Sequence, residues 1–129
     1  MGAKVWLVDD DVSVRESLGF LLRTVDYDVA DFADLASFET AAAGQQAISG
    51  CLLLDVRQPD NSNQSWLAQQ GARHPLLPVI IMTGHDTLEA CRHLFAGGAF
   101  AFFTRPLDIE SLLQTIQLAM RESEQRARL

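Results

Sequence analysis

The sequence predicts a three-layer α/β domain, with a five-stranded parallel sheet between two layers of helices. Five short apolar runs recur along the 129 residues, and their first residues lie 24, 22, 28 and 21 positions apart. Each interval has room for one crossover helix and its two loops, which a parallel connection requires. Strands and helices therefore alternate, and the crossovers are expected to be right-handed.

The apolar runs are the expected strands. Four of the five are almost continuously apolar, as strands covered on both faces must be, whereas Asp31 inside the second run fits an edge strand. We expect the strand order 2-1-3-4-5, in which the first and third strands are neighbours about 4.8 Å apart. The runs are Val5–Val8, Val29–Phe32, Cys51–Leu54, Val79–Met82 and Phe100–Phe103.

The segments between the runs differ in the strength of their helical pattern. Apolar side chains recur every three or four positions over residues 14–25 and again over residues 109–120. Such a stripe lets a helix pack on a sheet. Residues 65–71 give the weakest pattern, because they offer few apolar side chains for burial.

Polar residues and glycines mark the expected helix ends. Ser13 and Glu16 have the spacing of a capping box, which predicts the start of the first helix. Asp34 and Asp108 are the expected N-caps of the second and last helices. Gly97-Gly98 stands where the fourth helix must stop, since glycine accepts the left-handed conformation of a helix C-terminus.

Composition limits the kinds of function. With 48% hydrophobic and 21% charged residues, the chain can bury a real core. Its net charge of −7 argues against nucleic-acid binding by this domain, which needs clustered Lys and Arg. No apolar run approaches the ~20 residues that span a bilayer. Cys51 and Cys91 lie in apolar segments and are expected to be free, buried thiols, so we expect a soluble, cytoplasmic protein.

Reactive side chains follow four of the five predicted strands. Carboxylates crowded at neighbouring strand ends raise one another's pKa unless a cation joins them, and Mg²⁺ accepts carboxylate oxygens as ligands. A carboxylate beside such a cation can accept a phosphoryl group, whose oxygens a hydroxyl and a cationic side chain can hold. The strand-end residues are Asp9, Asp10, Asp11, Asp55, Thr83 and Arg105.

Four motifs carry a family resemblance: Val8-Asp9-Asp10-Asp11, Leu53–Asp60, Ile81–Gly84 and Phe102–Pro106. In order and spacing they resemble the receiver domain of bacterial response regulators, the CheY-like family. The resemblance covers residues 4–122 and implies a flavodoxin-like (βα)5 fold, with 123–129 as the start of a linker or an extension of the last helix. The motif residues are most similar to those of regulators with a DNA-binding output domain of the LuxR type, which implies transcription control through another domain.

The resemblance implies a role for each acidic site residue. Asp55 matches the phosphoacceptor, which receives a phosphoryl group from a sensor histidine kinase. Asp9 and Asp10 match the acidic pair that binds Mg²⁺ together with Asp55, and the backbone carbonyl of Arg57 matches a further ligand. The implied function is a regulatory switch without turnover of an external substrate.

The resemblance also implies moving parts. Thr83 matches the switch hydroxyl and Phe102 the switch aromatic. The peptide bond before Pro106 is cis in the family, which aims residue 105 into the pocket. The face made by the fourth helix, the fifth strand and the fifth helix is expected to form a homodimer after phosphorylation.

Three positions depart from the family pattern. Arg105 stands where the family has Lys, Asn63 where it prefers Gly, and Asp26 at another frequent Gly. Lys4, the only lysine, begins the first strand and is expected at the opposite end of the sheet, so either Arg105 supplies the cation or no residue does. These departures leave open a degenerate receiver that acts as an interaction module without phosphate.

Two enzyme classes of related architecture are disfavoured. A flavodoxin-type FMN protein needs a Gly/Ser/Thr-rich phosphate loop after the first strand, where this chain has Asp9-Asp10-Asp11. A phosphatase with an aspartate nucleophile needs a second Asp two residues after the first. Arg57 occupies that position.

Overall fold

The predicted strands form one parallel sheet in the computed structural model, which describes residues 3–57 and 61–129. The strand order is β2-β1-β3-β4-β5, so the predicted order is confirmed. β2, with Asp31 inside it, lies at one edge, and β5 lies at the other. The strands are β1 (Lys4–Val8), β2 (Asp28–Phe32), β3 (Cys51–Asp55), β4 (Val79–Thr83) and β5 (Ala101–Thr104).

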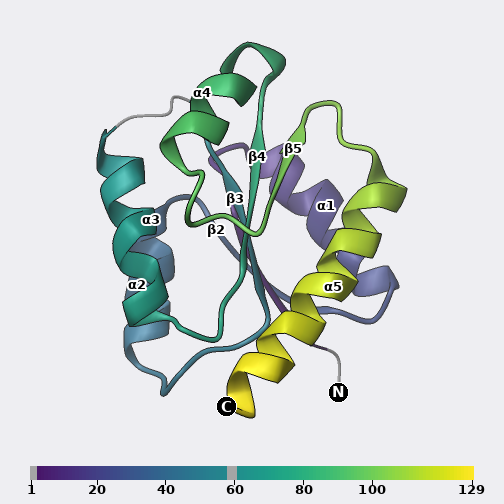
Figure 1. The fold of residues 1–129 in the computed structure, drawn as a ribbon. Helices are drawn as coiled ribbons and strands as arrows, with labels where there is room; N and C mark the ends of the chain where they lie inside the picture. Colours follow the sequence, from purple (N-terminus) through teal and green to yellow (C-terminus); the bar gives the residue numbers. More distant parts are fainter. Residues whose placement is uncertain (1–2, 58–60) are drawn as a thin grey trace.

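Helices cover both faces of the sheet, giving the expected flavodoxin-like three-layer fold (Figure 1). One layer holds α1 and α5, and the other holds α2, α3 and α4; a short 3₁₀ turn precedes α4. In the described part of the chain no helix has the length and apolar character needed to cross a membrane. The helices are α1 (Val12–Thr24), α2 (Leu35–Ala43), α3 (Asn61–Arg73), α4 (Leu88–Leu94) and α5 (Ile109–Ala127).

The alternation of side chains along each strand produces a core on each side of the sheet. On β1, Val5 and Leu7 pack toward α1 and α5, whereas Trp6 and Val8 pack toward the opposite layer, where Phe38 of α2 is completely buried. Each buried side chain of this size contributes about 1.5–3 kcal/mol. Burial of both faces therefore stabilises the three-layer arrangement.

The helix N-termini confirm two of the three predicted caps. Asp34 and Asp108 accept hydrogen bonds from backbone N–H groups of α2 and α5. The capping box predicted at Ser13 was wrong, because α1 begins earlier and Asp11 is its cap. The Asp11 carboxylate accepts from the N–H groups of Ser13 and Val14, so Ser13 already lies inside the first turn.

The expected role of Gly97-Gly98 also needs correction. α4 ends at Leu94, and within residues 3–57 and 61–129 the positive φ values belong to Asp26, at 73°, and Gly50, at 107°. Gly98 is needed for a different reason, which is close packing. A Cβ at Gly98 would lie 2.9 Å from Cγ of Leu67 on α3, so the turn after α4 approaches α3 too closely for a side chain.

Ser123 on α5 ties together two loops at the amino-terminal end of the sheet. Its buried hydroxyl accepts from the Gly50 N–H at 3.0 Å and donates to the Leu76 carbonyl at 2.6 Å. α5 continues to Ala127, so residues 123–127 extend the last helix. Where the domain gives way to any linker stays a prediction.

Gly50→Ala should destabilise the fold by at least ~1–3 kcal/mol, the cost of a strained backbone conformation. Its φ of 107° disfavours any side chain, and a Cβ there would lie only 2.0 Å from the Lys4 carbonyl oxygen. Urea denaturation measures the free energy of unfolding. Gly44→Ala is the matched control, since Gly44 has a φ of −84° and open space around it. Equal stability of the two variants would contradict the strain at Gly50.

Candidate functional site

Three carboxylates meet at the carboxyl ends of β1 and β3. Asp9, Asp10 and Asp55 each offer an oxygen within 4.8 Å of the others. The parallel register pairs Val8 with Leu54, which places the residues that follow these two beside each other. The Asp9 and Asp55 side chains are 0% and 2% exposed, whereas Asp10 is 70% exposed. Two of the carboxylates are therefore both adjacent and buried.

Arg105 reaches this cluster from the end of β5. Its Nη2 donates to Asp9 Oδ2 at 2.9 Å, and its Nη1 lies 2.6 Å from Asp55 Oδ1. The second contact is an ion pair whose N–H bonds are not directed at the oxygen, so Asp55 Oδ1 accepts no hydrogen bond from the described residues. The peptide bond between Arg105 and Pro106 is cis, and the Arg105 N–H donates to the Thr83 carbonyl.

A second guanidinium group, from Arg57, also contacts all three carboxylates. Its Nε lies 2.9 Å from Asp55 Oδ2 and 3.3 Å from Asp10 Oδ1, and its Nη2 lies 3.6 Å from Asp9 Oδ1. From the sequence, only the backbone carbonyl of Arg57 was expected at the site. Residues two apart in an extended segment point to the same side. This spacing from Asp55 was the available signal for the side chain.

Lys4 lies far from this cluster, as expected. It starts β1 and pairs with Asp28 on β2 at 3.3 Å, at the other end of the strand. Arg15 of α1 was also missed by the sequence analysis. Its Nη1 donates to the Asp9 carbonyl at 2.7 Å and its Nε pairs with Asp31 at 3.3 Å, which fixes the backbone that carries the buried carboxylate.

The electrostatics of the cluster follow from burial and from the two arginines. Burial raises the pKa of Asp9, because a charged carboxylate loses its hydration. The backbone N–H of Asp11 and both guanidinium groups act in the opposite direction. The hydrogen bond with Asp55 and its charge raise the pKa of Arg57, so this group stays protonated.

Thr83 and Phe102 lie near the cluster but contact other groups. The buried Thr83 hydroxyl donates to the Val56 carbonyl at 2.7 Å and shares a hydrogen bond with the Thr87 hydroxyl. Phe102 pairs with Ile81 across β4 and β5, and it packs half-buried on the core beneath α4. Thr83 therefore lies at the end of β4, between the strands that carry Asp55 and Arg105, and Phe102 lies on the adjacent strand β5.

Some residues of the predicted motifs cannot be placed. Gln58, Pro59 and Asp60 lie outside the described residues. Asn63 lies in α3, and its side chain is outside the described ones.

The donor set fits a hard divalent cation. Mg²⁺ prefers carboxylate and carbonyl oxygens and keeps several waters. The three carboxylates supply oxygens at suitable mutual distances. Asp55 Oδ1 is buried and accepts no hydrogen bond from the described residues, although Arg105 forms an ion pair with it. The half-exposed Arg57 side chain lies against the opposite oxygen, Oδ2.

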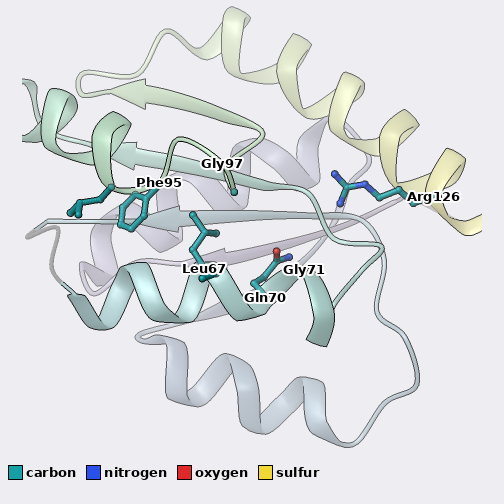
Figure 2. A pocket seen from close by; sticks show the side chains of 9 residues that line it. Leu67, Gln70, Gly71, Phe95, Gly97 and Arg126 are labelled. Carbon is teal, nitrogen blue, oxygen red and sulfur yellow. The ribbon is translucent and has the colours of Figure 1, made fainter.

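A cavity of about 480 Å³ lies elsewhere, between α3, the turn after α4 and the end of α5 (Figure 2). Leu67 and Gln70 project from α3 and Phe95 follows α4, while Arg126 enters from α5 (Figure 2). Arg126 is bonded to Glu122 and to the Pro75 carbonyl. None of the predicted site residues lines this cavity.

The buried carboxylate predicts a pH dependence of stability. Because the pKa of Asp9 is raised above 3.8 in the folded protein, the folded state holds this proton in a window where the unfolded chain has lost it. The free energy of unfolding therefore falls as pH rises through that window. Asn at position 9 has no such proton to lose. The free energy of unfolding of Asp9→Asn should therefore increase relative to that of the parent protein as pH rises from acid to neutral.

Urea titrations at several pH values, without divalent cations, measure this effect. Asp10→Asn, at an exposed carboxylate, is the matched control and should gain less. A stability difference between Asp9→Asn and the parent that stays constant, or that turns against the variant as pH rises, would contradict the cost of burying Asp9.

Comparison with known proteins identifies the family. The model of the response regulator receiver domain matches residues 5–117. The transcriptional regulatory protein FixJ of Bradyrhizobium diazoefficiens is 32% identical over 124 residues, which cover 96% of this chain and 60% of FixJ. The DNA-binding transcriptional regulator NtrC of Escherichia coli is 35% identical over 116 residues, which cover 90% of this chain and 24% of NtrC. This chain thus spans about 60% of FixJ and a smaller share of NtrC.

Solved structures agree. Full-length FixJ from B. japonicum superposes with a TM-score of 0.83 at 31% identity, covering 98% of this chain and 61% of that one. The beryllofluoride-activated NtrC4 receiver domain dimer superposes with a TM-score of 0.78 at 27% identity, covering 93% of this chain and 98% of that one. The sheet order, the clustered strand-end carboxylates and these matches lead to one conclusion: the chain belongs to the receiver domains of two-component response regulators.

Proposed function

We propose that this receiver accepts a phosphoryl group on Asp55 from a sensor histidine kinase in a Mg²⁺-dependent reaction. The proposal rests on the burial and hydrogen bonding of the Asp55 carboxylate. Its carboxylate is 2% exposed, and Oδ1 accepts no hydrogen bond from the described residues. A buried acceptor oxygen beside a guanidinium group is suited to nucleophilic attack on phosphorus.

The proposed transfer is a nucleophilic displacement at phosphorus. A carboxylate oxygen of Asp55 forms the new P–O bond while the P–N bond of the kinase phosphohistidine breaks. The imidazole nitrogen keeps that electron pair and takes up a proton, and Asp55 becomes an acyl phosphate. Mg²⁺, held by Asp10, Asp55 and the Arg57 carbonyl with Asp9 acting through water, would neutralise charge on the phosphoryl oxygens.

Arg105 supplies the cationic side chain in place of the family lysine. Its guanidinium carries a charge at every relevant pH and binds phosphoryl oxygens through several N–H donors. It already spans Asp9 and Asp55, and it is 26% exposed. Arg105 also lines an apolar groove of about 410 Å³ between α1 and the start of α5, with Val14 and Pro106. That groove is where we place the kinase surface that presents the phosphohistidine.

The switch is a shift between two conformations of the strand-end region. Thr83 would exchange its hydrogen bond to the Val56 carbonyl for one to the phosphoryl group, and Phe102 would follow inward. Such a ligand-driven change redistributes existing states without building a new fold. The altered surface is α4, β5 and α5. Control of transcription through an output domain is inferred from relatives that are named as transcriptional regulators.

One observation favours a second candidate, a receiver that works without phosphate. Both oxygens of Asp55 already face guanidinium groups, since Arg105 lies against Oδ1 and Arg57 bonds to Oδ2. A site neutralised in this way can hold a fixed conformation and serve as an interaction module.

Incubation with acetyl phosphate and Mg²⁺ distinguishes the two candidates. We expect intact-mass spectrometry to show one added phosphoryl group, which Asp55→Asn abolishes because, among the residues that the structure describes, no other carboxylate is both buried and positioned at the end of β3. Asp10→Asn is a control that should keep some labelling. A parent protein that stays unlabelled would favour the phosphate-independent module, and labelling that survives in Asp55→Asn would refute the assignment of the acceptor.

Activation with beryllofluoride should produce a homodimer through α4, β5 and α5. Leu118 is 53% exposed on α5. It lies on the same side of the helix as Glu122 and Arg126, at four-residue spacing, and Arg126 lines the cavity beside the turn after α4. Leu118→Arg should therefore prevent dimerisation in sedimentation velocity runs. Phe20→Arg, at a 73% exposed site on α1, is the control and should still dimerise. A parent protein that remains monomeric at high concentration would contradict this interface.

A further inference from the structure

The Arg57 side chain occupies the position at which a cation is expected. Its guanidinium lies within 3.6 Å of an oxygen from each of Asp9, Asp10 and Asp55. The same three residues form the group whose oxygens could hold a metal ion. An additional cation at these carboxylates would therefore lie next to the Arg57 guanidinium, and the two positive charges would repel each other.

The charge of the cluster leads to the same competition. Three carboxylates face two guanidinium groups, which leaves one negative charge. A divalent ion added to both arginines would leave a net positive charge in a pocket with two buried carboxylates. Like charges in such a setting repel strongly, because little water screens them.

The two arginines differ in how easily they can leave. Arg105 is 26% exposed, and the hydrogen bond from its N–H to the Thr83 carbonyl fixes the backbone that carries the side chain. Arg57 is 48% exposed and follows the end of β3, so its guanidinium can exchange its contacts with the carboxylates for contacts with water. Arg57 is therefore the group that yields to an incoming ion.

We infer that the Arg57 guanidinium is a resident counter-ion that competes with Mg²⁺ for the site carboxylates, so that the metal binds only when Arg57 turns outward. The inference rests on the proposed function, because it concerns the metal site of the same reaction. It makes Arg57 a determinant of Mg²⁺ affinity and assigns its side chain a role separate from that of its backbone carbonyl. Once the phosphoryl group adds negative charge, Arg57 and the metal no longer oppose each other.

The test is a titration of this chain with Mg²⁺ alone, followed by isothermal calorimetry and by amide chemical shifts. Arg57→Met keeps the length of the side chain and removes its charge, and it should bind Mg²⁺ about tenfold more tightly than the parent protein. Tenfold corresponds to ~1.4 kcal/mol. Arg57→Lys should fall between the two. Arg92→Met is the matched control, since Arg92 pairs with Glu89 on α4 away from the site and its loss changes the net charge equally.

Thermal unfolding gives an independent readout. Without metal, Arg57→Met should have a lower Tm than the parent, because the carboxylates lose a counter-ion, and added Mg²⁺ should raise its Tm by a larger amount. Equal or weaker Mg²⁺ binding by Arg57→Met, in a parent protein that does bind Mg²⁺, overturns the inference and leaves the proposed function standing. If none of the variants binds Mg²⁺, the inference and the proposed metal requirement both fail.

Discussion

The repulsion between two buried carboxylates is the constraint on which the rest of the site depends. Asp9 and Asp55 end neighbouring strands and are almost excluded from water. Apolar packing on both faces of the sheet fixes this adjacency, so the protein cannot relieve the repulsion by moving the strands apart. It must supply positive charge instead, and that requirement explains why cationic groups converge on this edge of the sheet.

The two arginines meet this requirement by different routes. Arg57 is close to Asp55 in the sequence and needs only an extended segment to reach it. Arg105 follows β5, and β4 lies between β5 and β3. Its side chain must therefore extend past the end of β4, a strand spacing of ~4.8 Å, to reach Asp55. The less exposed Arg105 side chain is therefore suited to stay in the site, whereas the half-exposed Arg57 side chain is suited to leave it.

The two ends of the sheet differ in their interactions. At the amino-terminal end, Ser123 and Gly50 join α5 to the loops around β3 through buried hydrogen bonds and a close backbone approach. At the carboxyl end, the packing tolerates crowded charge and a buried oxygen without a hydrogen bond from the described residues.

The sequence by itself predicted all five strands to within one residue at each end, because apolar runs mark strands that are buried on both faces. The strand order and the carboxylate cluster were expected from the fold type that the βα alternation and the family resemblance implied. It also indicated the caps at Asp34 and Asp108, which are local. Three features needed the tertiary structure. Asp11 displaced the expected cap because its carboxylate reaches the first free N–H groups of α1. Gly98 is required by the nearness of α3, not by its backbone angle. The Arg57 and Arg105 side chains converge on Asp55 from separate elements, and the direction of a long, flexible side chain depends on charges that only the folded chain brings together.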